Sequence, residues 1–327
     1  MKLNLTIRQW VCAVLLLGLA VLPGVAYLVG ESYYITFATR ILIMALAAAG
    51  LNIALGYGGM ISLGHALYLG LGAYAVGICA HHGIDSGWQQ LVIALAVGGL
   101  LACVLGAICL RTSGMAFIMI TLAFAQMLYF LIVTLDDYGG DDGLPIAARS
   151  TFGSLDVNNS TVFYYLTFAV LLATLLFTAR MVNARFGRVI RGCMSNHQRM
   201  RALGYDTLRY RLAAYVLSAL VCVVAGFLLA NLVKFASPSY LVWIVSGELM
   251  VMVILGGMGT VMGPVVGALI VLLIEAVFAN AGFGLPSNIA TFVNDHWMAV
   301  LGIVIVLGTM TVEKGVYGSL PGRNNKS

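Results

Sequence analysis

Charged side chains are scarce in this sequence. Asp, Glu, Lys and Arg make up 9% of the 327 residues, and hydrophobic residues make up 61%. An ordinary soluble domain carries about 25% charged residues, so the composition excludes a soluble globular protein and predicts an integral membrane protein. The apolar runs are continuous and do not alternate with polar residues, which favours membrane-spanning helices over barrel strands.

The sequence also lacks the motifs of several function classes. Five of its six cysteines fall in apolar runs and Cys193 lies in a basic segment, with no CxxC or Cys/His ligand spacing. We therefore predict no disulfide framework and no metal site. A nucleotide-binding pattern G-x-x-x-x-G-K-[ST] is missing, so the chain is not expected to bind ATP itself. The sequence offers no nucleophile–base pair and no paired carboxylates at mid-membrane depth, so it gives no support for an enzyme.

Long apolar runs dominate what is present. Each is close to the ~20 residues that cross a bilayer core, and together they predict an all-α polytopic fold, one transmembrane domain over residues 1–327 with ten spans. The first run is longer than a typical cleaved signal sequence and is expected to remain as a helix with a kink near Pro23. The predicted spans cover residues 10–30, 34–56, 60–80, 90–110, 115–135, 161–182, 210–232, 241–258, 263–282 and 296–312.

The charges that do occur are distributed unevenly between the two sides. With a cytoplasmic N-terminus, the inner segments hold fourteen of the seventeen Lys and Arg residues, and the outer loops hold only Arg149 and Lys234. Cytoplasmic loops of membrane proteins are enriched in these cations. The cations behind the net charge of +5 are therefore explained by membrane topology, and no nucleic-acid partner is predicted. Both termini are predicted to lie on the cytoplasmic side. The largest outer loop, residues 136–160, is acidic.

The segment 180–211 carries eight arginines and a single acid, Asp206. Ser195 at an N-cap with Gln198 three residues later fits a capping box, and Gly204 is a suitable C-terminal stop. These signals predict a short cytoplasmic helix near residues 196–203, before a span capped by Asp206 or Thr207. Such a basic helix can contact either an ATPase subunit or anionic lipid headgroups.

Few polar side chains lie within the spans. Arg40, Glu248 and Glu275 are each predicted about 10 Å below the outer surface, so Arg40 can pair with either glutamate. The cluster is either a structural ion pair or part of the lining of a substrate path. Asn52, His65 and Gln126 are further candidates for that path, with hydrogen bonding and packing between helices as the alternative. Glycines concentrate at 56–64 and 256–263, which predicts tight turns or broken helices there.

Several of these segments resemble branched-chain amino acid ABC transporter permeases of the LivM type. The basic segment GRVIRGCMSNHQRMRALGYDTLRYR resembles the family's coupling segment, and four other blocks occur in the family's order. The resemblance extends from about residue 40 to 312. The four blocks are GGMISLGHALYLGLGAY at Gly58–Tyr74, RTSGMAFIMITLAFAQ at Arg111–Gln126, YGGDDGL at Tyr138–Leu144 and ILGGMGTVMGPVVGA at Ile254–Ala268.

The resemblance implies a permease subunit of an ABC importer in the bacterial inner membrane. It would act with a second homologous permease, an extracytoplasmic binding protein and two cytoplasmic ATPases, which would hold the ATP and Mg²⁺; no cofactor is expected on this chain. The family often has Glu-Asn-Glu where this chain has Ser195-Asn196-His197, so an acidic contact to the ATPase is not carried over. Expected ATPase contacts are Ser195, His197, Arg199, Arg201, Ala202, Leu203 and Gly204, and expected docking residues for the binding protein are Asp141, Asp142 and Gly143.

The substrate remains open between several classes. Branched-chain or related hydrophobic amino acids suit a path with few charges, and urea, short amides or small organic acids are alternatives among the family's relatives. An ion-coupled secondary transporter is a different class. It would need a proton or sodium relay, for which Arg40, Glu248 and Glu275 are the candidates.

Overall fold

The computed structural model describes residues 7–29, 32–153, 157–279, 302, 306, 310 and 315–319. These residues form mainly long helices, with two short strands that pair antiparallel. A π-helical turn, Ile53–Tyr57, extends α2, and 3-10 turns occupy Asp136–Tyr138 and Pro238–Leu241. The elements are α1 Ile7–Val29, α2 Ser32–Asn52, α3 His65–His81, α4 Gly87–Cys109, α5 Met115–Val133, β1 Leu144–Pro145, α6 Ser160–Asn183, α7 Arg185–Ser195, α8 His197–Ala202, α9 Thr207–Val233, β2 Phe235–Ala236, α10 Trp243–Gly257 and α11 Gly263–Ala279.

The helices match the predicted polytopic membrane class. Five helical stretches are long and apolar enough to cross a membrane, and three shorter apolar helices accompany them. The number ten stays a prediction, because most of the expected last span, 296–312, lies outside the described residues. The five stretches are Tyr33–Tyr57, Gly87–Cys109, Met115–Val133, Ser160–Asn183 and Thr207–Val233, and the shorter helices are Trp10–Gly24, Trp243–Gly257 and Gly263–Val277.

One predicted span is broken. The span expected at 60–80 becomes helical only at His65, and the chain from 59 to 64 is irregular. Gly59 has φ +62°, a left-handed conformation that disfavours other residues. The glycines therefore interrupt the helix between α2 and α3, as the broken-helix interpretation of this segment expected.

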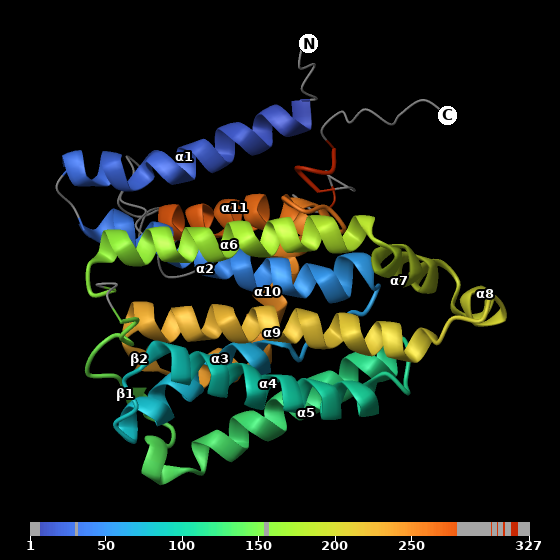
Figure 1. Cartoon of the computed structure of the whole chain (residues 1–327), viewed down its shortest axis with the longest axis horizontal. Coiled ribbons are helices and arrows are strands. Elements are labelled where there is room, and N and C mark those ends of the chain that lie inside the picture. Colours follow the sequence, from blue (N-terminus) through green and yellow to red (C-terminus); the bar gives the residue numbers. More distant parts are fainter. Residues whose placement is uncertain are drawn as a thin grey trace, which may run out of the picture.

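The two ends of the bundle differ (Figure 1). The long helices lie side by side, α7 and α8 project at one end, and β1 and β2 pair at the opposite end. The Ile7 end of α1 and residues 315–319 lie at the α7 end, where Val316 N–H donates to Leu255 O at 2.8 Å.

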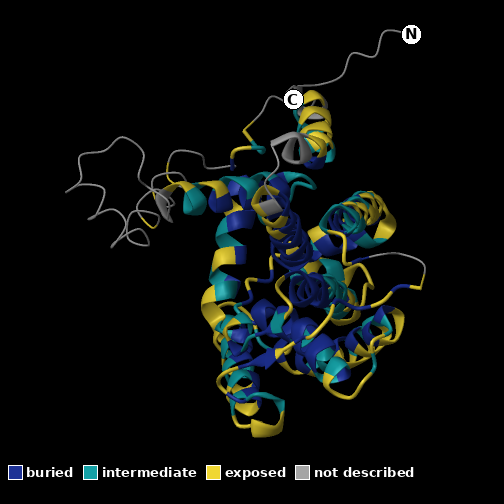
Figure 2. Cartoon of the chain, turned by 90° about the vertical axis from the view of Figure 1, so that its left-hand side faces the viewer, coloured by how far each residue is buried: buried dark blue, intermediate teal, exposed yellow. Residues whose placement is uncertain are grey.

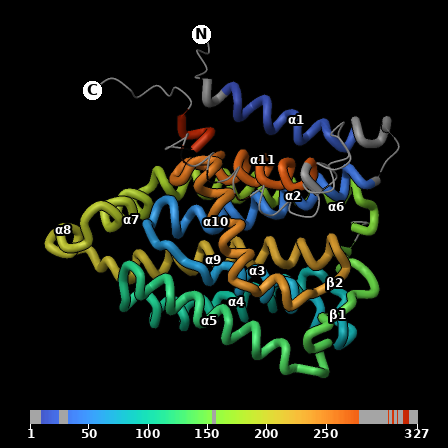
Figure 3. Tube along the Cα trace, turned by 180° about the vertical axis from the view of Figure 1, so that it is seen from behind, coloured from blue at the N-terminus to red at the C-terminus, as the bar shows by residue number. Residues whose placement is uncertain are grey.

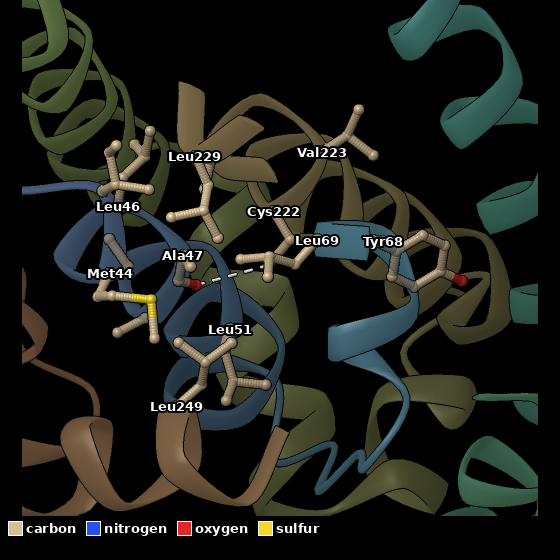
Figure 4. Packing of buried hydrophobic residues seen from close by; sticks show 14 of the residues in the cluster. Met44, Leu46, Ala47, Leu51, Tyr68, Leu69, Cys222, Val223, Leu229 and Leu249 are labelled. Carbon is tan, nitrogen blue, oxygen red and sulfur yellow. Dashed lines mark hydrogen bonds between the residues drawn. The ribbon is translucent and has the colours of Figure 1, made fainter. Parts of the chain in front are cut away.

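Helices α2 and α9 form the centre of the bundle. Every residue from Ile41 to Asn52 is buried, and α9 packs against α2, α3 and α4. Figure 4 shows this core at the α2–α9 contact, where the Cys222 thiol lies 3.5 Å from the Ala47 carbonyl oxygen. A Cβ added at Gly72 would collide with the Val223 carbonyl. Small residues permit this close approach of α3 and α9, since packing drives helix association in lipid.

Helices α4, α5 and α6 are the least buried of the five long apolar stretches, and Figure 2 shows exposed residues on the outside of the bundle and buried ones in its middle. In the most apolar stretch of Tyr33–Tyr57, 94% of the residues are buried, against 28% in α4, 22% in α5 and 33% in α6. The buried residues of α5 fall on one stripe, Phe117, Thr121, Ala125, Leu128 and Ile132, with the spacing of a helix face. The remaining apolar faces of these helices are therefore suited to contact lipid.

Candidate functional site

An amphipathic helix that the sequence analysis missed connects the bundle to the predicted short helix. Helix α7 buries Val189, Ile190 and Cys193, whereas Arg185, Arg188 and Arg191 are exposed. The apolar positions recur every three to four residues with arginines between them, so this helical signal was present in the sequence. Helix α7 carries α8 outward from the end of the bundle (Figure 1).

The short helix α8 forms where it was predicted, but the predicted cap is wrong by one residue. The Asn196 side-chain oxygen accepts from the Arg199 N–H at 2.9 Å, and Ser195 is the last residue of α7. Because α7 uses Ser195 in its final turn, the extended cap conformation falls on Asn196. The Gly204 stop has φ +84° and Asp206 caps α9, so both of these predictions are confirmed.

Helix α8 is anchored to the start of α9 by polar contacts. His197 Nε2 lies 3.2 Å from Thr207 Oγ1, and Arg201 Nε donates to the same oxygen at 3.3 Å. Partial burial lowers the pKa of His197, and the charges of Arg201 and Arg211 add to the effect. Burial and these charges therefore favour the neutral imidazole in the folded chain.

The outward side of α8 combines cations with apolar surface. Arg199, Arg201 and Ala202 are exposed, as are Ser195 and Gly204, and Leu203 is 65% exposed. Next to them is a pocket of about 300 Å³, lined by Arg201, Gly204, Tyr205, Asp206, Thr207 and Leu208. A basic helix beside an exposed leucine and a pocket has the features of a protein-docking surface.

Contacts link this surface to the glycine-rich turns. A Cβ on Gly59 would meet the Met194 side chain of α7 at 2.8 Å. Asn52 Nδ2 donates to Thr260 O at 2.8 Å, and Asn52 Oδ1 accepts from Gly259 N–H at 3.0 Å. Gly56 also lies close to Gly259, so the two glycine-rich segments meet. Asn52 is buried and has the interhelical hydrogen-bonding role that was the alternative to a place on the substrate path.

His65 also has an interhelical role. It is fully buried at the start of α3, with Nε2 2.8 Å from Ser218 Oγ of α9. The Ser218 hydroxyl donates to Gly50 O of α2 at 2.6 Å, so His65 joins three helices. Gln126 is half-buried on α5, and no hydrogen bond links its side chain to another described residue.

The structure brings the three charged candidates together at the outer half of α2, α10 and α11. Arg40 Nη2 donates to Glu275 Oε1 at 3.5 Å, which confirms the predicted pairing and selects Glu275. Glu248 is exposed, and the charges of Glu275 and Arg40 both act on its carboxylate. Figure 3 shows that α10 crosses the bundle obliquely, and α10 packs against both α2 and α11.

The outer loop is pinned to the bundle by a buried arginine that the sequence analysis did not single out. Arg149 donates to the carbonyls of Asn231, Val157 and Asn158 at 3.1, 3.0 and 3.2 Å, and its guanidinium lies 4.8 Å from the Phe163 ring centroid. Burial lowers the pKa of Arg149. Beside it, Ser150 Oγ donates to Asn231 Oδ1 at 2.8 Å.

The three predicted docking residues separate into two kinds. Asp141 and Asp142 are exposed, whereas Gly143 is buried. Gly143 has φ +83°, and an added Cβ would lie 2.7 Å from Ala236 O. Gly143 therefore shapes the turn before β1, and the aspartates form the accessible part of this loop.

The comparisons with known proteins agree with these features. The family described as branched-chain amino acid transport system / permease component matches residues 33–308. The high-affinity branched-chain amino acid transport system permease protein LivM of Salmonella typhimurium is 24% identical over 297 residues, covering 84% of this chain and 67% of the relative. LivM of Escherichia coli K12 is 24% identical over 326 residues, covering 92% and 73%.

LivH, a permease protein with the same system name in Escherichia coli K12, is 26% identical over 253 residues, covering 71% of this chain and 80% of LivH. No solved structure matches the chain significantly. The LivM resemblance inferred from the motifs is confirmed, and the chain is a multi-pass membrane permease component. The match covers most of the chain, which belongs to the family of branched-chain amino acid transport system permease components.

Proposed function

We propose that this chain is a permease subunit of an ABC importer that moves branched-chain amino acids inward across the bacterial cytoplasmic membrane. The observation that carries the proposal is the family match over residues 33–308. The names of the LivM and LivH relatives support the substrate class. ATP is hydrolysed by partner subunits, and this chain changes conformation in response.

The basic helix α8 receives force from an ATPase subunit. Its exposed arginines and Leu203 form the contact, and the adjacent pocket accepts a side chain from the partner. From α8 the path of contacts runs through Met194 of α7 to Gly59, at the break between α2 and α3. A displacement of α7 therefore acts on a segment without regular helical hydrogen bonds, where movement costs less than in a packed helix.

The partners follow from the same system. LivM and LivH relatives both match this chain, which supports a complex of two homologous permeases with two ATPases. An extracytoplasmic binding protein delivers the amino acid to the end that carries the outer loop, where Asp141 and Asp142 are accessible. Arg40, Glu248 and Glu275 line the path below that end.

Charge reversal on α8 tests the coupling role. The double variant Arg199→Glu with Arg201→Glu should insert and assemble but lose leucine uptake and its coupling to ATP hydrolysis. Arg111→Glu with Arg180→Glu is matched in net charge and changes exposed arginines outside α8, and it should transport normally. Normal uptake by the α8 variant would assign the helix to lipid headgroups.

Substrate and docking are tested in the same reconstituted complex. With its binding protein, the wild type should import radiolabelled leucine, and import of urea without leucine would overturn the substrate assignment. Asp141→Lys with Asp142→Lys should weaken stimulation of the ATPase by the binding protein, whereas Asp85→Lys, at an exposed acid outside the 136–160 loop, should not. Unchanged stimulation in the double variant would remove the aspartates from the docking face.

A further inference from the structure

The cluster of Arg40, Glu248 and Glu275 has an excess of one negative charge. Its members come from three helices, α2, α10 and α11, and one cation faces two carboxylates. Within this cluster, Arg40 and Glu275 form an ion pair, with Arg40 Nη2 3.5 Å from Glu275 Oε1. Glu248 lies within the electrostatic reach of both but makes no ion pair with a described residue.

The cluster lies at membrane depth and on the surface of this chain. Arg40 is in the third turn of α2, which places it about 12 Å from the outer end at 1.5 Å per residue. The side chains of Arg40 and Glu275 are 48% and 28% exposed, and Glu248 is exposed as well. Charges in contact with lipid tails are costly, so this face meets a water-filled path or another polar surface.

From this placement we propose that the cluster binds the zwitterionic head of the substrate. Glu248 accepts hydrogen bonds from the α-ammonium group, Arg40 binds the α-carboxylate, and Glu275 holds the Arg40 guanidinium in position. The inference rests on the proposed function and assigns a substrate subsite within it. Arg40 is suited to this role because a guanidinium has five N–H donors, and the ion pair with Glu275 uses one nitrogen at long distance.

The charges match a zwitterion better than either of its halves. The ammonium group neutralises the carboxylate that lacks an ion-pair partner among the described residues, and the carboxylate group finds a planar fork that accommodates two parallel hydrogen bonds. Ile244 lies one helical turn before Glu248 on α10 and is 54% exposed. Residues four apart share a helix face, so an aliphatic side chain can lie on Ile244 while the head group contacts Glu248.

The test uses the complete complex in proteoliposomes with its binding protein and radiolabelled leucine. Glu248→Gln keeps the shape and removes the charge, so leucine uptake should fall about tenfold. Glu248→Asp keeps the charge and should lose less, and Arg40→Gln should behave as Glu248→Gln does. Asp85→Asn removes an exposed outer carboxylate elsewhere and should leave uptake unchanged.

Two further measurements make the result decisive. In the Glu248→Gln complex, the second permease should still co-purify and the loaded binding protein should still stimulate the ATPase, which together show an assembled transporter that fails at the substrate. Wild-type uptake in Glu248→Gln, or loss of the second permease from it, would overturn the inference, the latter by making the cluster an intersubunit contact. Absence of leucine uptake in the wild type would instead overturn the proposed function, before any variant is compared.

Discussion

Replacement of Arg149 by Met should release the outer loop from the bundle. The arginine is buried and lies between the loop and the ends of two helices, since it donates to Asn231 O of α9 and to Val157 O and Asn158 O ahead of α6. Methionine preserves the apolar stem that packs beside Phe163 but offers no donor. Three carbonyl groups would then lose a charged partner in a buried site.

The size of the effect follows from these contacts. A hydrogen bond to a charged group contributes about 1.5–3 kcal/mol, but the cost of burying the guanidinium offsets part of the sum. We therefore expect the free energy of unfolding to fall by about 2–4 kcal/mol in Arg149→Met. For a chain of this size about 2 °C of melting temperature accompanies each kcal/mol, so the melting temperature should fall by roughly 4–8 °C.

Thermal denaturation of the purified protein in detergent measures this change, and limited proteolysis locates it. Arg149→Met should become sensitive to cleavage within 136–160, and Arg149→Lys, which keeps the charge but not the planar fork, should lie between it and the wild type. Lys234→Met removes an exposed outer cation and serves as the matched control. An unchanged melting temperature and cleavage pattern in Arg149→Met would refute the assignment of Arg149 as the anchor of this loop.

Three further predictions concern other contacts. Gly72→Ala should lower the free energy of unfolding by roughly 1–3 kcal/mol, because the added Cβ meets the backbone of α9. Gly99→Ala is the control, because a Cβ there makes only ordinary contacts. Equal melting temperatures of the two variants would contradict the close approach of α3 and α9. Asn52→Ala leaves two backbone groups of the second glycine-rich turn unpaired, so a loss of about 2–3 kcal/mol is expected in thermal melts, and a neutral effect would show that the turn does not need this bridge. The pKa of His197 is lowered in the folded chain, so its contribution to stability is present above about pH 6.5 and is lost as the pH falls below that value. Proteolysis at α8 should therefore increase at acidic pH in the wild type but not in His197→Gln, and the same increase in both would contradict this role of His197.

The short basic helix illustrates how far local patterns extend. The Gly204 stop and the Asp206 cap were predictable because each depends on the conformation of a few adjacent residues. The choice between Ser195 and Asn196 as the preceding cap was not, because it depends on where α7 ends. That helix is amphipathic and ends in a turn that includes Ser195; a search for apolar periodicity within the arginine-rich stretch would have located it.

By itself, the sequence determined the membrane class and the family, because hydropathy and motif order are properties of the linear chain. Only the tertiary structure decided which groups meet across long separations. Arg40 pairs with Glu275, 235 residues away, and Asn52 joins a turn 208 residues away, and either pairing depends on which helices pack together and in what rotation. Arg149 shows the same limit, since the sequence placed it only in an outer loop, whereas the packing of that loop against α9 makes it a buried anchor.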